Sequence, residues 1–174
     1  MVKIRKGTFE TNSSSTHSIC ICKEDRGLSI PERISINLKD YEFGWEYDKY
    51  YGTDEKLAYI IMGLLGKTYY ADFIEGCNDL KRLLETIGKW VKSVNIQGLE
   101  MTMYDGKTYL EESDGYVDHA SEMGELLEAI LADEDLLKRY LFSTDSIIFT
   151  GNDNEDGYPN VHLGYEYEEF YKGN

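Results

Sequence analysis

Hydrophobic and polar residues alternate in several short segments of the chain, a two-residue period that is typical of strands with one buried face. Residues 99–104 and 107–110 flank Asp105-Gly106, a dipeptide that favours a tight hairpin turn. Short apolar runs elsewhere also predict strands, and an acidic tail follows the last of them. The predicted strands are residues 2–6, 19–22, 34–38, 99–104, 107–110, 146–150 and 161–165.

Leucine and isoleucine recur every three or four residues in other segments, as in helices that bury one face. Thr53 and Asn78 precede two such segments and suit the N-cap position, and Ser121 precedes a third. Residues 135–142 predict a short fourth helix. Residues 40–51 are aromatic and acidic without a clear period, so we predict an ordered loop whose rings cover part of the core.

Strands and helices occur in blocks rather than in regular alternation. This order predicts an α+β fold, with a mainly antiparallel sheet and three to four helices packed on it. The length of 174 residues and the 41% hydrophobic content suit one globular domain that spans residues 1–174. No internal repeat is visible.

The net charge is −15, from 33 acidic and 18 basic residues. Such a field repels phosphate backbones, which argues against nucleic acid as a partner. It permits contact with a basic protein surface, although high solubility alone is the simpler explanation. The 15 tyrosines are the compositional anomaly, and many of them lie among carboxylates in residues 41–51 and 158–171.

The cysteines Cys20, Cys22 and Cys77 do not predict a disulfide framework, because their number is odd and Cys20 and Cys22, two positions apart on one strand, cannot bridge without distortion. They fit a reducing compartment. The first 20 residues lack the apolar core of a signal peptide, and no apolar run reaches 18 residues. We therefore expect a cytoplasmic protein that does not enter a membrane; nothing in the sequence indicates an oligomeric state.

Residues 9–18 are the most chemically dense segment of the chain, and we predict a loop here between two strands. Hydroxyl and amide side chains favour turns, but this segment holds more of them than one turn needs. His17 beside several hydroxyls is a candidate general acid or base, and Ser15 a candidate nucleophile. Asn12, Ser13 and Ser14 are candidate ligand-binding residues. The structural alternative is a loop histidine bonded to a backbone carbonyl.

A second polar segment contains Asp118, His119 and Ser121 at the predicted start of a helix. His119 is a further candidate catalytic residue, and Asp118 and Ser121 are candidate ligand-binding residues. Neighbouring side chains of an extended segment point in opposite directions, so we do not expect Asp118 to orient His119. Ser121 has a simpler role as N-cap. A helix N-terminus attracts anions where it is open.

A third polar segment follows the strand predicted at residues 146–150. Asn152 is a candidate ligand-binding residue, and Asp153 a candidate catalytic residue that orients or coordinates a ligand. Residues 152–157 match part of a calcium-binding EF-hand loop, but Leu163 stands where that loop has its bidentate glutamate. Calcium binding is therefore not predicted.

Cys20 and Cys22 together with His17 and His119 would suit zinc in composition, but their spacing matches no zinc knuckle. Structural cysteines are the simpler reading. The glycines at positions 63 and 66 lack the spacing of a nucleotide-binding phosphate loop. No metal is assigned, and any cofactor stays unknown.

The sequence Phe-Glu-Thr-Asn-Ser-Ser-Ser-Thr-His-Ser at residues 9–18 resembles the opening of a family of small uncharacterised proteins of bacteriophages and Gram-positive bacteria. The resemblance extends to Gly-Tyr-Val-Asp-His-x-Ser at residues 115–121 and to Phe-Thr-Gly-Asn-Asp-Asn at residues 149–154. It implies a bacterial cytoplasm, that of the host if a phage encodes the chain, and it implies no particular reaction.

Two hypotheses follow. In the first, the three polar segments form one site that binds or hydrolyses a nucleotide-like or phosphate-bearing ligand, so that a small polar molecule is the partner. In the second, the protein is not catalytic, and an acidic, tyrosine-rich face blocks a basic groove on a host protein. Whether the chain is an enzyme depends on whether the three segments converge.

Overall fold

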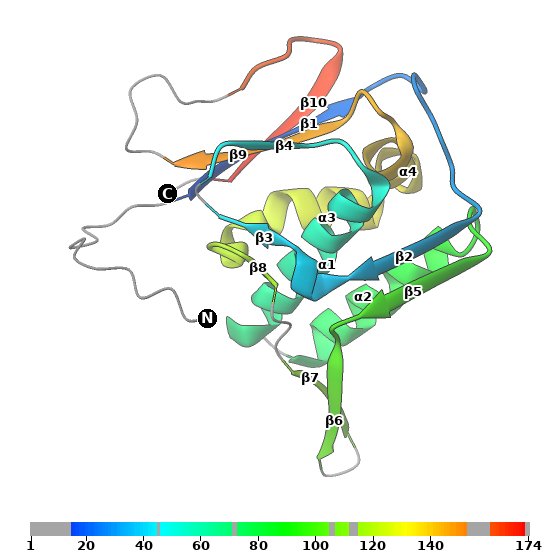
Figure 1. Ribbon diagram of the computed structural model, residues 1–174, viewed down its shortest axis with the longest axis vertical. Helices are drawn as coiled ribbons and strands as arrows, with labels where there is room; N and C mark the ends of the chain where they lie inside the picture. The colour runs from blue at the N-terminus through cyan, green and yellow to red at the C-terminus, as the bar shows by residue number, and fades with distance from the viewer. Residues whose placement is uncertain are drawn as a thin grey trace.

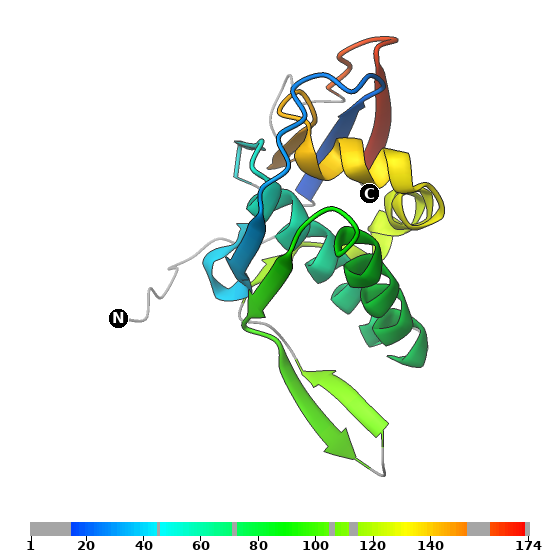
Figure 2. The same ribbon diagram turned by 90° about the vertical axis from the view of Figure 1, so that its right-hand side faces the viewer.

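The computed structural model describes residues 15–44, 46–70, 73–104, 107–111, 115–152 and 161–172. A four-stranded sheet lies at the top of Figure 1, the helices lie below it, and one of the two-stranded ribbons extends to the lower edge. The view in Figure 2, turned by 90°, shows the same layers from the side. The α+β class and the mainly antiparallel sheet are therefore confirmed.

The main sheet has the strand order β10-β1-β9-β4, and all its pairs are antiparallel. The long strand β1 (Ser15–Cys22) lies between β10 (Tyr167–Lys172) and β9 (Ile147–Asn152), and β4 (Asp48–Tyr50) pairs with the other side of β9. Every residue of β1 is buried. Its backbone groups therefore need partners on both sides, and β9 and β10 supply them.

Smaller ribbons complete the β-structure. The parallel pair β3–β8 matters most for the site, because it brings the 115–119 segment beside the chain that leads to the main sheet. The β6–β7 hairpin projects from the body of the molecule (Figure 2). The ribbons are β2 (Arg33–Asn37) with β5 (Ser93–Gln97), β3 (Glu42–Phe43) with β8 (Tyr116–Val117), and β6 (Glu100–Tyr104) with β7 (Lys107–Glu111).

The central helix is α1, which is apolar around much of its circumference; Leu57, Tyr59, Ile60 and Ile61 are fully buried. A helix that is hydrophobic on all sides belongs inside a fold, and α1 contacts the other three helices. The helical elements are η1 (Leu38–Asp40), α1 (Thr53–Tyr70), α2 (Phe73–Ile87), η2 (Ala120–Met123), α3 (Gly124–Ala132) and α4 (Glu134–Phe142).

Close contact between α1 and η2 depends on a glycine. A Cβ atom at Gly66 would lie 2.3 Å from the Cβ of Ala120, so only glycine lets η2 come this near. At Gly63 a Cβ atom would meet the end of the Met123 side chain, which can move aside more easily. This contact fixes the segment that carries Asp118 and His119 against the core.

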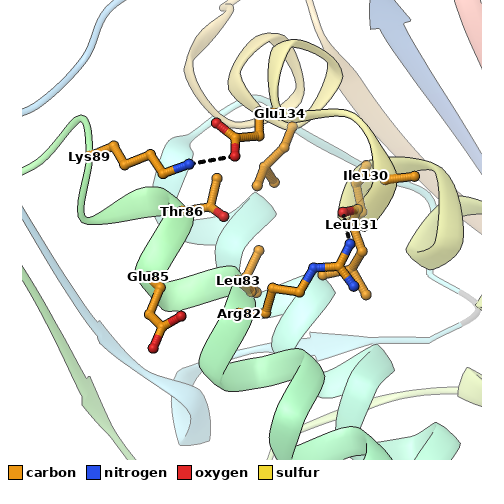
Figure 3. A pocket seen from close by; sticks show the side chains of 10 residues that line it. Arg82, Leu83, Glu85, Thr86, Lys89, Ile130, Leu131 and Glu134 are labelled. Carbon is orange, nitrogen blue, oxygen red and sulfur yellow. Dashed lines mark hydrogen bonds and ion pairs between the residues drawn. The ribbon is translucent and has the colours of Figure 1, made fainter.

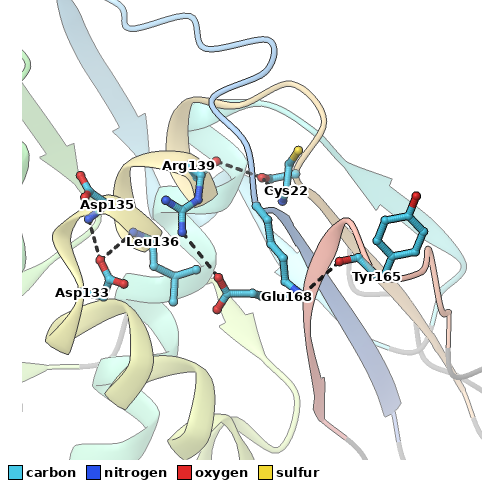
Figure 4. Close-up of polar contacts among 9 residues, drawn as sticks. Cys22, Asp133, Asp135, Leu136, Arg139, Tyr165 and Glu168 are labelled. Atoms are coloured by element: carbon cyan, nitrogen blue, oxygen red, sulfur yellow. Dashed lines mark hydrogen bonds and ion pairs between the residues drawn. The ribbon is translucent and has the colours of Figure 1, made fainter.

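An ion pair joins the helical layer to the sheet. Arg139 of α4 approaches Glu168 of β10, with 3.5 Å between Nη2 and Oε1, and Figure 4 shows the two side chains meeting between their elements. Asp133, also drawn there, caps α4 by accepting hydrogen bonds from the backbone N–H groups of Asp135 and Leu136. Glu168 of β10 thus has a structural role, because it links the sheet to α4.

Several predictions of elements were wrong. Residues 161–165 are not a strand; the edge strand is β10, in the segment predicted as an acidic tail, because Phe170 packs on the core there and β1 needs a partner. Residues 40–51 are not one loop: η1 ends at Asp40, and the segment contains the short strands β3 and β4. Thr53 does not cap α1; its hydroxyl donates to Leu141 O.

Candidate functional site

The polar residues from Ser15 to Ser18 are part of β1, not of a loop as predicted, and each is at least 96% buried. Alternation along the strand places Ser15 and His17 on the face that also carries Ile19 and Ile21, toward α1. The opposite face is covered in part by Val161, whose N–H donates to Ser18 Oγ. The serine-rich segment therefore reaches inside the fold.

His17 uses both ring nitrogens inside the protein. Nε2 lies 3.0 Å from Gly44 O, and Nδ1 lies 2.9 Å from the hydroxyl of Tyr59 on α1. A carbonyl only accepts, so Nε2 carries the hydrogen and the Tyr59 hydroxyl donates to Nδ1. Burial, with a smaller effect of the nearby charge of Lys172, lowers the pKa of His17 to about 3. His17 is a neutral residue that ties β1 to α1.

Lys172, at the end of β10, is the functional candidate that sequence reasoning missed. It is opposite His17 in the β1–β10 register and is 1% exposed. Its Nζ donates to Ser15 Oγ at 2.7 Å and to Ser15 O at 3.1 Å. Burial lowers its pKa to about 8, while the charges of Asp118 and Glu122 act in the opposite direction. The one available signal was that Lys172 lies two residues after Phe170. This spacing predicts that both side chains face the core, but only if the segment is known to be a strand.

We call the buried residues Ser15, His17, Tyr59 and Lys172 the polar cluster. Asp118 and His119 form its rim: the Asp118 N–H donates to Phe43 O, one residue before the Gly44 carbonyl that His17 contacts. Their side chains are 29% and 44% exposed. Their nearest charged atoms are 3.9 Å apart, which is too long for a hydrogen bond. His119 has a left-handed backbone, with φ of 50°, and leads directly into η2.

Ser121 does not cap a helix, contrary to the prediction. It lies inside the short 3₁₀ turn η2, whose cap position is taken by His119 without a side-chain hydrogen bond. The α-helix proper begins at Gly124. Ser121 is exposed on this turn, two residues after His119, and is not part of the polar cluster.

The first and third polar segments meet in the sheet. Thr150 is opposite His17, and Asn152 is opposite Ser15, so the backbones of β1 and β9 bring them side by side. The Thr150 hydroxyl donates to Glu46 O. Asn12, Ser13, Ser14 and Asp153 lie outside the described residues. Thus Ser15, His17, Asp118 and His119 come together, with the backbone of Asn152 beside them.

The cysteines of β1 fit the structural reading. Cys20 and Cys22 are buried free thiols, and burial, with the charge of Glu169, raises the pKa of Cys20 to about 12. Among the residues described, no group of three metal-ligating side chains could hold an ion. His162 lies at the surface, where its Nδ1 is 2.8 Å from Glu169 Oε2.

Two pockets lie away from the polar cluster. One, of about 320 Å³, is framed by α2, α3 and α4; Figure 3 shows its rim, where Arg82 bonds to Leu131 O and Lys89 to Glu134. The other, of about 440 Å³, lies between the start of α1 and the end of α4. Neither is lined by a residue of the polar cluster.

Comparison of the chain with protein-family models, curated proteins and solved structures finds no match. The resemblance to small phage and Gram-positive proteins therefore stays a prediction. In the described part of the chain no helix is long and apolar enough to cross a membrane.

Proposed function

We propose that the polar cluster and its rim bind a small, phosphate-bearing ligand, as a nucleotide-like molecule would supply, and act on it. The observation that carries this proposal is the buried ammonium group of Lys172. Its hydrogen bonds go to Ser15, a neutral residue, and no ion pair with a carboxylate is found among the described residues. An anionic group would complete its surroundings.

A buried charge without an ion partner is unfavourable by several kcal/mol even after the protein relaxes. Asp118 and Glu122 reduce this penalty from a distance, because their charges raise the pKa of Lys172, yet burial outweighs them. Such an unbalanced group is a frequent property of functional sites. A phosphate oxygen beside Nζ would form a charge-assisted hydrogen bond with it, and relief of the unpaired buried charge would strengthen ligand binding.

Lys56 shows what a structural buried lysine looks like in the same fold. It is fully buried, and its Nζ donates to Ser143 O at 2.7 Å. Ser143 is the C-cap of α4, where the helix dipole favours a positive charge. Lys172 has no helix end to stabilise, which leaves its charge without a structural role of this kind.

The charge of the whole chain supports a small ligand over a polymer. With a net charge of −15, a nucleic-acid backbone is repelled, but one phosphate group can reach a local cation. Asp118 and His119 are the exposed members of the site, so a ligand would approach across the rim.

The test is thermal unfolding in inorganic phosphate and in adenosine monophosphate, each compared with chloride at equal ionic strength. Ligands that bind only the folded state raise the unfolding midpoint. We expect this rise for the wild type and for Lys56→Met, and its loss in Lys172→Met. An equal rise in all three proteins, or none in the wild type, contradicts the proposal.

A second candidate is the non-catalytic one, a protein that blocks a basic groove on a host protein. It is favoured by exposed tyrosines at both edges of the main sheet, with Tyr47 and Tyr51 flanking β4 and Tyr165 and Tyr171 at β10. These segments lie on opposite edges rather than in one patch. Titration with poly-lysine should weaken in Tyr165→Ser and not in Tyr116→Ser, an exposed control; equal affinities contradict it.

A further inference from the structure

We propose that Ser15 is a nucleophile and that Lys172 is its general base, so that the polar cluster transfers a phosphoryl group through a covalent Ser15 intermediate. This inference rests on the proposed function for its substrate class, a phosphate ester. Beyond ligand binding, it assigns a chemical reaction to the polar cluster and a catalytic role to Ser15. The observation behind it is the 2.7 Å contact between Ser15 Oγ and Lys172 Nζ inside the fold.

The sheet holds the two groups in this relation. Lys172 is opposite His17, so Ser15 is its diagonal neighbour on the same face of the β1–β10 pair, within reach of a long side chain. A second hydrogen bond, from Nζ to Ser15 O, fixes the amine over the serine. A nucleophile and a base within 2.6–3.2 Å are the geometric requirement for activation.

Two other buried serines, Ser143 and Ser146, lack this arrangement. The hydroxyl of Ser143 donates to Arg26 O, and that of Ser146 donates to Arg139 O. Their hydrogens are committed to backbone carbonyls. Ser15 Oγ instead meets an amine that can either donate or accept, depending on its protonation.

Lys172 can lose its proton near neutral pH. The charged and titratable groups around it are His17 on β1, which is neutral, and Asp118, His119 and Glu122 on the β8–η2 segment. The two carboxylates favour the ammonium form and burial favours the amine, with burial the larger effect. At a pKa of about 8, a substantial fraction of the amine is free to act as a base.

The reaction balances without any further reagent than water. Neutral Lys172 takes the hydroxyl proton as Ser15 Oγ bonds to phosphorus. The leaving ester oxygen, on the opposite side of the phosphorus, takes a proton from water as its bond breaks, and Lys172 returns its proton to the hydroxide so formed. Water then attacks the phosphoserine with Lys172 as base, which releases phosphate and restores Ser15. Ser-Lys pairs are a known variant of the hydroxyl–base arrangement.

A fluorophosphonate probe tests the nucleophile directly. Ser15 Oγ would bond to phosphorus, fluoride would leave, and Lys172 would keep the proton. Because Ser15 is fully buried, the probe must reach it across the rim through small local motions that keep the Ser15–Lys172 contact, so we expect slow labelling of the folded full chain. Peptide mass spectrometry should place the label on Ser15, and the rate should rise between pH 6 and 9 with a midpoint near 8.

Matched variants separate chemistry from structure. Ser15→Ala should abolish labelling, and Ser146→Ala should leave it unchanged. Lys172→Arg keeps a positive charge but cannot act as a base in this pH range, so it should lower the rate at least tenfold and remove the pH midpoint. Lys56→Met should keep both the labelling rate and its pH midpoint.

The wild type alone can overturn the inference, whether or not a variant folds. A label on another residue, or a rate on Ser15 that does not change between pH 6 and 9, contradicts it. Labelling of Ser15 without any phosphate-dependent rise in unfolding midpoint would reject the phosphate ligand and keep the nucleophile. A phosphate-dependent rise without labelling would keep the binding site and reject the nucleophile.

Discussion

His17 and Lys172 lie directly opposite each other on β1 and β10, and the charge of the lysine contributes to keeping the histidine neutral. Two potentially cationic side chains thus share one buried space. The protein resolves this conflict by giving His17 two hydrogen bonds that suit the neutral ring, and by giving Lys172 the serine.

Acid should destabilise the protein through His17. Its folded pKa is about 3 against 6.5 for the free side chain, so the unfolded state binds the extra proton and stability is lost as pH falls from 6.5 toward 3. Urea unfolding between pH 5 and 6.5, above the titration of most carboxylates, should show this slope. His17→Gln should flatten it, and His162→Gln, at the surface, should not; an unchanged slope in His17→Gln would refute the assignment.

Mild alkali should stabilise the protein. Lys56 and Lys172 both have folded pKa values near 8 against 10.5 in the free side chain, so the unfolded state binds more protons between those values and stability rises with pH. The window from pH 8 to 9.5 lies below the titration of the tyrosines. Cys20, whose pKa is raised by burial, opposes the two lysines in this window with a smaller effect. We expect a rise on the order of 1 kcal/mol in the free energy of unfolding, and a smaller rise in either Met variant. A fall over this window contradicts the prediction.

The two buried lysines should differ in their contribution to stability. Lys56→Met leaves Ser143 O at the C-cap of α4 without its partner, which should destabilise by about 1–3 kcal/mol at pH 7. Lys172→Met also leaves Ser15 Oγ and Ser15 O without their donor, but it removes a buried charge that neither a helix end nor an ion pair among the described residues balances. It should therefore be closer to neutral. Denaturant unfolding of both variants measures the difference. A larger loss for Lys172→Met would show that its charge is structural.

Gly66→Ala should separate η2 from α1. Alanine is the better helix former by about 1 kcal/mol, but the new methyl group would overlap Ala120, and overpacking typically costs about 1–3 kcal/mol. Gly124→Ala, at the start of α3 with open space around it, is the matched control and should be neutral or slightly stabilising. Denaturant midpoints decide, and equal stability of the two variants contradicts the steric explanation.

The fold class and most helices follow from the sequence because the periods of their apolar residues are strong. The α4 helix agrees within one residue of prediction, and the alternation at residues 34–38 gives β2 within one residue at each end. The β5 strand was missed, although Val94 and Ile96 alternate with polar residues. The local residue pattern also does not show that the polar start of β1 will pair with strands on both sides.

The site could be predicted only in part, because local composition marks polar residues but does not show which of them become buried. Ser15 and His17 attract attention by composition, but their burial depends on β9 and β10, which come from the other end of the sequence. Lys172 has no local signal that separates it from a surface lysine. Its role becomes visible only through the register that places it opposite His17.

The order β10-β1-β9-β4 also has a consequence for synthesis. Ser15 and Lys172 are separated by 157 positions, so the contact between them is among the longest that the chain can make. Long-range pairing slows folding, and during translation β1 has no partner on one side until residue 172 has left the ribosome. A nascent chain that stops before β10 cannot form the serine–lysine pair. The site is therefore complete only after β10 has been synthesised and has paired with β1.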